Sequence, residues 1–223
     1  MTGSTSMISG NNRLLPTLAL LLLAPLAWCA APERQTLQGL LTDLARPAPS
    51  STPFVEAHFS PLLARPLVVA GTLEYLGPGK LARTVQAPYH ERSEIDGDEA
   101  TVARAGEPAR RFSLARAPQM QTLVASFAGL LSGNAATLER NFTLDLHGDA
   151  SHWLLGLVPL NPQVRAAIRS IAVSGSGSQP RCLTTFQAND DTTILLLDRA
   201  ARAPRPAAPD RAWFETQCQG RNR

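Results

Sequence analysis

The sequence predicts an α+β domain with one antiparallel sheet of about ten strands that helices interrupt. Short segments that alternate apolar and polar residues are separated by Gly, Pro, Asn and Asp, which is typical of strands joined by turns. One long amphipathic helix stands among them. The chain has 223 residues, 44% of them hydrophobic, enough for one sizeable core.

A first helix is expected over Glu33–Arg46, because its leucines recur with helical spacing. The Pro- and Ser-rich segment 46–53 then breaks the helix as a loop. The strands expected next are Phe54–Leu63, Pro66–Leu76, Lys80–Gln86, Tyr89–Ile95, Glu99–Arg104 and Ala109–Leu114. The turn 96–98, Asp-Gly-Asp, favours a tight hairpin between two of them.

The central helix, 118–131, has a continuous apolar stripe with helical spacing. The stripe consists of Met120, Leu123, Val124, Phe127, Leu130 and Leu131. Ser132-Gly133-Asn134 follows, and this triplet suits a left-handed helix end. A lone apolar helix in a β-rich chain is expected to cover one face of the sheet.

A short helical turn at Asn134–Arg140 leads to the second group of strands. Asn161-Pro162 is typical of a helix start, so a short helix is expected to end at Arg169. The strands expected in this half are Phe142–His147, Ser151–Val158, Ser170–Gly175, Arg181–Ala188 and Thr192–Asp198.

Two segments, Leu67–Ala70 and Trp153–Val158, are apolar at consecutive positions instead of alternating. Both faces of the sheet are therefore expected to be covered, or to contact lipid, at these segments. A solid core packed by helices explains this pattern, and so does a curled sheet with a helix over an apolar cavity. Periodicity alone favours the solid core.

The N-terminus predicts export. Arg13 precedes the apolar run Leu14–Ala27, and small residues follow this run. This pattern predicts that residues 1–30 are a cleavable signal peptide of a periplasmic protein. Lipidation of Cys29 is disfavoured because the bulky Trp28 precedes it. The domain is expected over 31–199, with a basic Pro/Ala/Arg-rich tail over 200–223. In an exported chain, Cys182 and Cys218 permit a disulfide, and two free thiols are the alternative.

The sequence does not support nucleic-acid binding, catalysis, or metal or cofactor binding. The 21 basic and 18 acidic residues form no basic block with interleaved aromatics, so no nucleic-acid partner is expected. The sequence offers no nucleophile–base motif, no metal-ligand spacing and no phosphate or dinucleotide loop, so we expect no catalytic residues, metal or cofactor. The scattered histidines are His58, His90, His147 and His152.

The order of these segments resembles the LolA-like periplasmic lipoprotein carriers over about Leu37–Asp198. The resemblance is carried by Gly71-Thr72-Leu73-Glu74-Tyr75 with Pro78, by Ile95-Asp96-Gly97-Asp98, by Leu130-Leu131-Ser132-Gly133 before Phe142-Thr143-Leu144, and by Trp153-x-Leu155-x-Leu157-x-Pro159. It implies an open half-barrel whose helices cap a hydrophobic cavity. It also implies a monomeric, non-enzymatic carrier of acylated lipoprotein or another lipid, between an inner-membrane transporter and an outer-membrane acceptor.

The residues expected to bind lipid lie on the central helix and on the strands beneath it. They are Leu73, Tyr75, Leu123, Val124, Phe127, Leu130, Leu131, Trp153, Leu155 and Leu157. The family's lid-latching arginine is replaced here by Gly77, with Lys80 and Arg83 nearby, so a different latch or purely apolar closure is expected. Two alternatives stay open: an exported sensor or assembly module that binds a lipid or protein without shuttling it, and, less favoured, an enzyme of envelope lipid metabolism.

Overall fold

The structure is a computed structural model that describes residues 36–220, except for the side chains of Gln119, Leu123, Ala125 and Phe127. Its contacts divide the chain into two units, Met1–Ala31 and Pro32–Arg223, and every described element belongs to the second. The predicted signal peptide and Cys29 lie outside the described residues. Within 36–220, no helix has the length and apolar composition needed to cross a bilayer.

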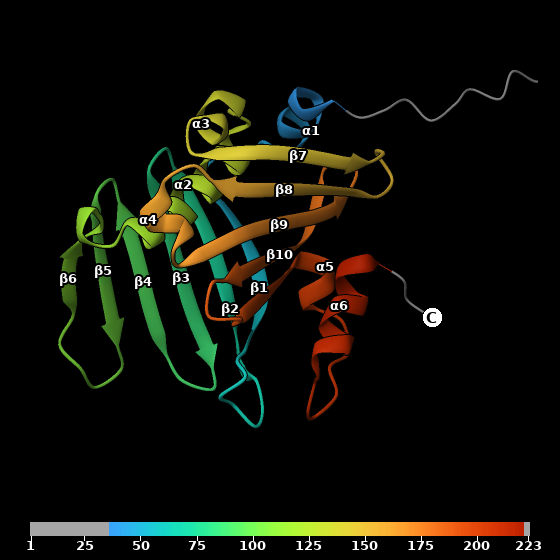
Figure 1. The fold of residues 1–223 in the computed structure, drawn as a ribbon. Helices are drawn as coiled ribbons and strands as arrows, with labels where there is room; N and C mark the ends of the chain where they lie inside the picture. Colours follow the sequence, from blue (N-terminus) through green and yellow to red (C-terminus); the bar gives the residue numbers. More distant parts are fainter. Residues whose placement is uncertain (1–35, 221–223) are drawn as a thin grey trace, which may run out of the picture. The chain divides into compact units, whose positions relative to one another are not determined.

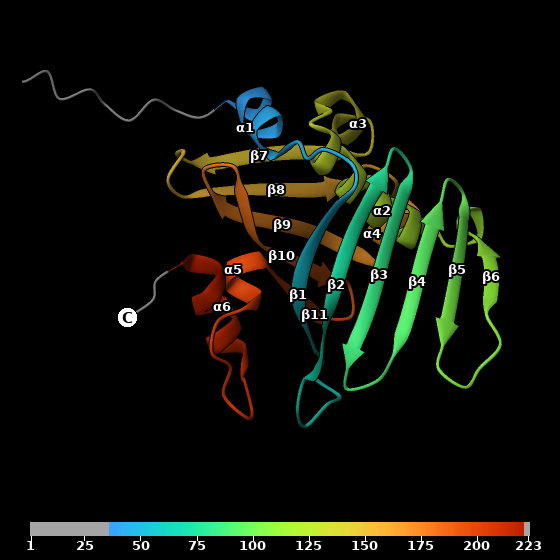
Figure 2. The same ribbon diagram turned by 180° about the vertical axis from the view of Figure 1, so that it is seen from behind.

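Eleven antiparallel strands form one sheet in the order β6-β5-β4-β3-β2-β1-β11-β10-β9-β8-β7 (Figure 1). The strands are β1 Ser50–Phe59, β2 Leu67–Gly77, β3 Lys80–Ala87, β4 Glu91–Asp96, β5 Glu99–Arg104, β6 Arg110–Ser113, β7 Phe142–Gly148, β8 Trp153–Pro159, β9 Ile168–Ser176, β10 Gln179–Gln187 and β11 Thr192–Leu197. The sheet ends at β6 on one side and at β7 on the other. Strands β7–β9 run across the direction of β2–β5, as the view from behind also shows, so the sheet is a curved, open half-barrel (Figure 2). This is the predicted fold class.

Four helices and a 3-10 turn lie on the concave side: α1 Leu37–Leu44, η1 Leu114–Arg116, α2 Pro118–Ser132, α3 Ala135–Glu139 and α4 Pro162–Arg165. Apolar side chains of the four helices and of β7–β11, with Phe54 of β1 and Val85 of β3, form an inner core. Leu41 of α1 and Leu138 of α3 are fully buried in it, together with Leu155 and Leu157 of β8. Burial of each such side chain stabilises the fold by about 1.5–3 kcal/mol relative to exposure.

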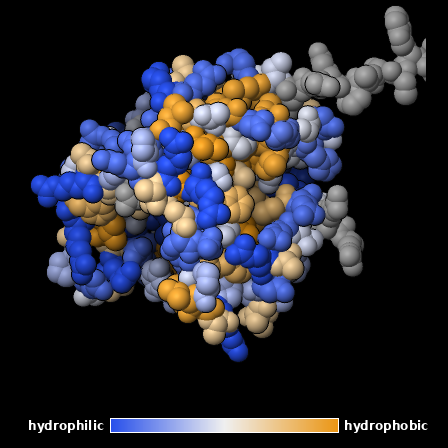
Figure 3. All heavy atoms as spheres, in the orientation of Figure 1, coloured by the Kyte–Doolittle hydropathy of each residue, from blue (hydrophilic) through white to orange (hydrophobic). Residues whose placement is uncertain are grey.

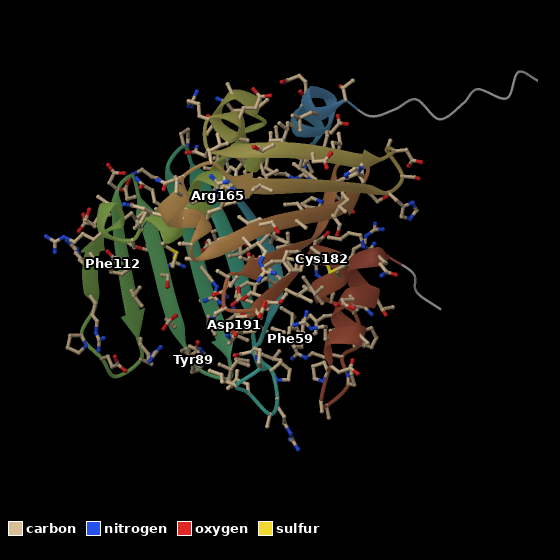
Figure 4. All side chains as sticks on the ribbon, in the orientation of Figure 1. Phe59, Tyr89, Phe112, Arg165, Cys182 and Asp191 are labelled. Carbon is tan, nitrogen blue, oxygen red and sulfur yellow. A yellow bond between two sulfur atoms is a disulfide. The ribbon has the colours of Figure 1, made fainter. Side chains whose placement is uncertain are left out.

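A second core covers the outer face of β1, β10 and β11. Two helices pack there, α5 Asp198–Ala201 and α6 Arg211–Gln219. Phe214 of α6 is fully buried, Asp210 caps the helix by accepting a 2.8 Å hydrogen bond from the Trp213 N–H, and a Cys182–Cys218 disulfide joins α6 to β10 (Figure 4). Residues 198–219, expected largely as a tail, are therefore part of the compact unit.

Element boundaries differ from expectation where pairing overrides composition. β1 begins at Ser50, inside the segment expected to be a loop, because Ser50 pairs with Tyr75 of the long strand β2. The same strand ends at Phe59, four residues before the expected Leu63. The helix expected to reach Arg169 ends at Arg165, because β9 pairs with β10 from residue 168 onward.

The two doubly apolar segments have different surroundings. Val68 and Ala70 pack against the outer core while Val69 packs against the inner one, as predicted for a strand covered on both faces. On β8 one face is not covered by protein, because Leu154 and Val158 are 44% and 40% exposed. Contact of this face with lipid, the other expected surrounding, stays a prediction. Apolar side chains are visible on the surface around β7 and β8 (Figure 3).

Candidate functional site

A cavity of about 1060 Å³ lies between α2 and the concave face of the sheet. The large apolar side chains around it come from α1, α2, strands β2–β5 and β9–β11, and the β3–β4 turn. They are Leu44, Leu73, Tyr75, Leu81, Tyr89, Ile95, Val102, Met120, Val124, Leu130, Leu131, Val173, Leu183 and Leu197. Strand alternation explains this wall, because the paired residues Leu73 and Arg83, Tyr75 and Leu81, and Leu81 and Ile95 must share one face.

Five of the ten residues predicted to bind lipid line this cavity: Leu73, Tyr75, Val124, Leu130 and Leu131. The side chains of Leu123 and Phe127 lie outside the described residues, although their backbone belongs to α2.

The remaining three predicted residues, Trp153, Leu155 and Leu157, lie on the concave face as expected. The structure places them in the inner core, at most 2% exposed, and not among the cavity-lining residues. The difference has a packing cause. Side chains of α1, α3 and α4 fill the concavity over β7–β9 and leave it open over β2–β5.

The cavity wall also contains an ion pair that sequence reasoning missed. Arg83 Nη2 donates to Glu56 Oε1 at 2.9 Å, and both side chains are only about a quarter exposed, at 28% and 27%. The Arg83 guanidinium also lies over the ring of Phe54, 4.9 Å from its centroid. The sequence contained a signal for this position. Leu81, Arg83 and Val85 occupy every second position of β3, so the Arg83 side chain points to the same face as the two apolar ones.

The C-terminal half of α2 is attached firmly to its neighbours. The Arg46 N–H donates to Leu131 O at 2.9 Å, which joins the segment after α1 to the end of α2, and Leu130 is buried in the inner core. Gly133 ends the helix with φ 65°, the left-handed conformation expected for this stop. In the N-terminal half, Val124 lines the cavity and Met120 is 43% exposed.

The positions considered for a latch have other roles. Gly77 adopts φ 137° at the β2–β3 turn, and Lys80 pairs with Asp96 at 2.8 Å on the surface. The Arg46 guanidinium donates to Ser178 O in the β9–β10 turn, and both residues line the cavity. Arg46 thus ties the end of α1 to the sheet beside the cavity.

Two of the scattered histidines lie beside aspartates near the β7–β8 turn. Nε2 of exposed His147 lies 2.8 Å from Asp145 Oδ2. The His152 backbone N–H donates to Asp149 Oδ1 at 3.1 Å, and hydrogen bonds from Ser151 lower the pKa of the Asp149 carboxyl. Within residues 36–220, no group of three His, Cys, Asp or Glu side chains is arranged to hold a metal ion.

A family model described as outer membrane lipoprotein carrier protein LolA-like matches residues 29–220. No curated protein matches the chain significantly. Among solved structures, a LolA superfamily protein of Nitrosomonas europaea is 10% identical with a TM-score of 0.43, covering 74% of this chain and 92% of that one. A putative outer membrane lipoprotein-sorting protein domain of Vibrio parahaemolyticus is 8% identical with a TM-score of 0.40, covering 83% and 97%. LprF of Mycobacterium bovis is 11% identical with a TM-score of 0.33, covering 78% and 96%.

The family match covers both cores, the whole sheet and the helices around the cavity. The chain therefore belongs to the LolA-like family of outer membrane lipoprotein carrier proteins.

Proposed function

We propose that this protein is a periplasmic carrier that holds the acyl chains of a lipoprotein, or of another lipid, in the cavity under α2. The observation that supports this most directly is the cavity itself, which at about 1060 Å³ is slightly larger than most ligand pockets. The apolar part of its wall suits a hydrocarbon chain, and the polar and charged side chains that also line it suit the polar end of a lipid. Transfer from water stabilises each buried methylene by about 0.8 kcal/mol, so ten methylenes contribute about 8 kcal/mol before ordering costs.

In this proposal α2 is the lid. Its N-terminal half covers the cavity, whereas its C-terminal half is held by the inner core and by the Arg46–Leu131 hydrogen bond. An inner-membrane transporter would load the cargo and an outer-membrane acceptor would remove it. The protein acts as a monomer, without catalysis, after removal of its signal peptide.

Two valine-to-aspartate substitutions, one on α2 in the cavity wall and one on the outer face of the sheet, test the role of the cavity. Val124→Asp places a carboxylate in the cavity wall, and we expect the purified protein to lose acyl lipid that native mass spectrometry detects in the wild type. Val158→Asp makes the same change on the exposed outer face of β8 and is expected to retain the lipid. Wild-type protein that carries no lipid and takes up no acylated probe would refute the proposal.

A sensor or assembly module that binds without shuttling is the second candidate, and the firm attachment of α2 at Leu130 and Leu131 favours it. Mixing the lipid-loaded protein with acceptor vesicles discriminates between the two. A carrier is expected to give up its lipid to the vesicles, whereas a sensor retains it.

A further inference from the structure

The loop between β1 and β2, residues 60–66, projects from one end of the sheet with its apolar side chains in solvent. Leu62 is 93% exposed, Leu67 at the start of β2 is 59% exposed, and Leu63 is 38% exposed. Figure 3 shows apolar side chains at this lower edge of the molecule, where Figure 1 places the loop. Isolated exposed leucines are ordinary, but three within six residues of a projecting loop form a patch.

The base of this loop is fixed by the body of the protein. His58 Nε2 lies 3.3 Å from Asp191 Oδ2, and His58 Nδ1 lies 3.2 Å from Thr193 Oγ1. Phe59 packs edge-on against Phe214, with ring centroids 5.7 Å apart. Within the loop, the Leu63 N–H donates to Ser60 O at 3.1 Å. The leucines are therefore held out by an ordered turn.

The charge around the patch is basic where it is exposed. Residues 60–67 contain Arg65 and no acidic residue, and Arg65 is exposed at the tip. Arg211 lies over the Phe59 ring at 5.0 Å, beside the base of the loop. Two acidic groups on neighbouring elements are engaged: Asp191 lies 3.3 Å from His58, and Asp210, next to Arg211, caps α6.

We propose that this loop inserts its leucines into the surface of a lipid bilayer that contains anionic headgroups. A narrow apolar tip with an adjacent arginine suits a fluid surface that closes around it, whereas a protein partner would need a groove shaped to the tip. Tyr89, which lines the cavity, lies at the same end of the molecule as Phe59 (Figure 4). Insertion would therefore bring this end of the cavity to the membrane. Membrane contact itself does not require that the cavity carries lipid.

Co-sedimentation with vesicles tests this inference on the chain from Pro32 onward, which contains both cores and so has the parts of an independent domain. We expect the double variant Leu62→Ser/Leu63→Ser to bind vesicles of phosphatidylcholine and phosphatidylglycerol at least tenfold more weakly than the wild type. Arg65→Gln should weaken binding to these vesicles and leave binding to pure phosphatidylcholine unchanged. Leu154→Ser, at an exposed leucine on β8, is the matched control and should bind as the wild type does.

Equal vesicle binding by the double variant and the wild type would overturn the inference. Sedimentation velocity measures self-association of the same proteins. If the double variant loses self-association while its vesicle binding is unchanged, the loop contacts a second copy of the chain, and the inference is overturned. Native mass spectrometry of the same samples reports bound lipid separately. Failure of the membrane contact is thus distinguishable from failure of the carrier role.

Discussion

Removal of one partner of the ion pair in the cavity wall is expected to destabilise the fold. At an effective dielectric constant of 20, two unit charges about 4 Å apart attract by about 4 kcal/mol, and desolvation of the two groups offsets much of this. The Arg83 guanidinium over Phe54 adds about 0.5–1 kcal/mol. Arg83→Met leaves Glu56 charged in an apolar wall, so we expect a net loss of about 2 kcal/mol, or a Tm lower by about 4–8 °C.

The double variant Arg83→Met/Glu56→Leu distinguishes the cost of an unpaired Glu56 charge from a simple loss of packing. Because neither charge is then left unpaired, the double variant should recover at least half of the stability lost by Arg83→Met. Urea unfolding followed by circular dichroism measures both differences.

A surface ion pair of similar geometry provides the control. Lys80 Nζ lies 2.8 Å from Asp96 Oδ2, but the two side chains are 54% and 69% exposed. Lys80→Met should therefore cost about 0.5 kcal/mol or less. Equal costs of Arg83→Met and Lys80→Met would show that burial does not strengthen the Glu56–Arg83 pair. Simple addition of the effects of the two cavity substitutions would show that the two charges are not coupled.

Three further predictions concern the sheet and its outer core. Gly71→Ala should destabilise by about 2 kcal/mol or more in urea unfolding, because a β-carbon there would lie 1.8 Å from the Thr84 carbonyl oxygen; an unchanged midpoint would refute this. Phe214→Ala should cost about 3–5 kcal/mol, measured by thermal melting, because the ring is fully buried; a loss below 1 kcal/mol would show that α6 is dispensable. The pKa of Asp191 is lowered from its ordinary value of 3.8, mainly by hydrogen bonding with Ser60. The ionised Asp191 carboxylate therefore stabilises the fold above pH 3.8, and this stabilisation is lost as pH falls through the folded-state pKa. The stability difference between wild type and Asp191→Asn should therefore be constant above about pH 5 and shrink below pH 4, and a pH-independent difference would contradict this.

The strands and the central helix were predictable because their signals are local. Alternation places Leu73 and Tyr75 on one face whatever lies above that face, and the stripe on α2 predicts an apolar contact without saying with what. Leu130 belongs to the inner core as well as to the cavity wall, whereas Val124 lines the cavity without joining that core, and both belong to the same stripe. The stripe cannot separate these two surroundings, because they depend on where α1, α3 and α4 pack.

The docked C-terminal helix was hard to predict for a different reason. The helix α6 buries few side chains, chiefly Phe214, and follows a Pro- and Arg-rich segment that is typical of a linker. Its place depends on the link from Cys218 to Cys182, 36 residues earlier, and on the cap by Asp210. Cysteine spacing permits such a link, but only the fold brings the two sulfur atoms together.

The concave face is divided into two parts with different physical properties, and this division determines which residues can respond to a ligand. Over β7–β9 it is filled, so Leu155 and Leu157 can be displaced only by breaking the inner core. Over β2–β5 the space is open and its wall includes the Glu56–Arg83 pair, so a ligand can enter without displacing buried side chains. Because α2 extends over both parts, its C-terminal half shares the stability of the core, and its N-terminal half is the part whose position can depend on what fills the cavity.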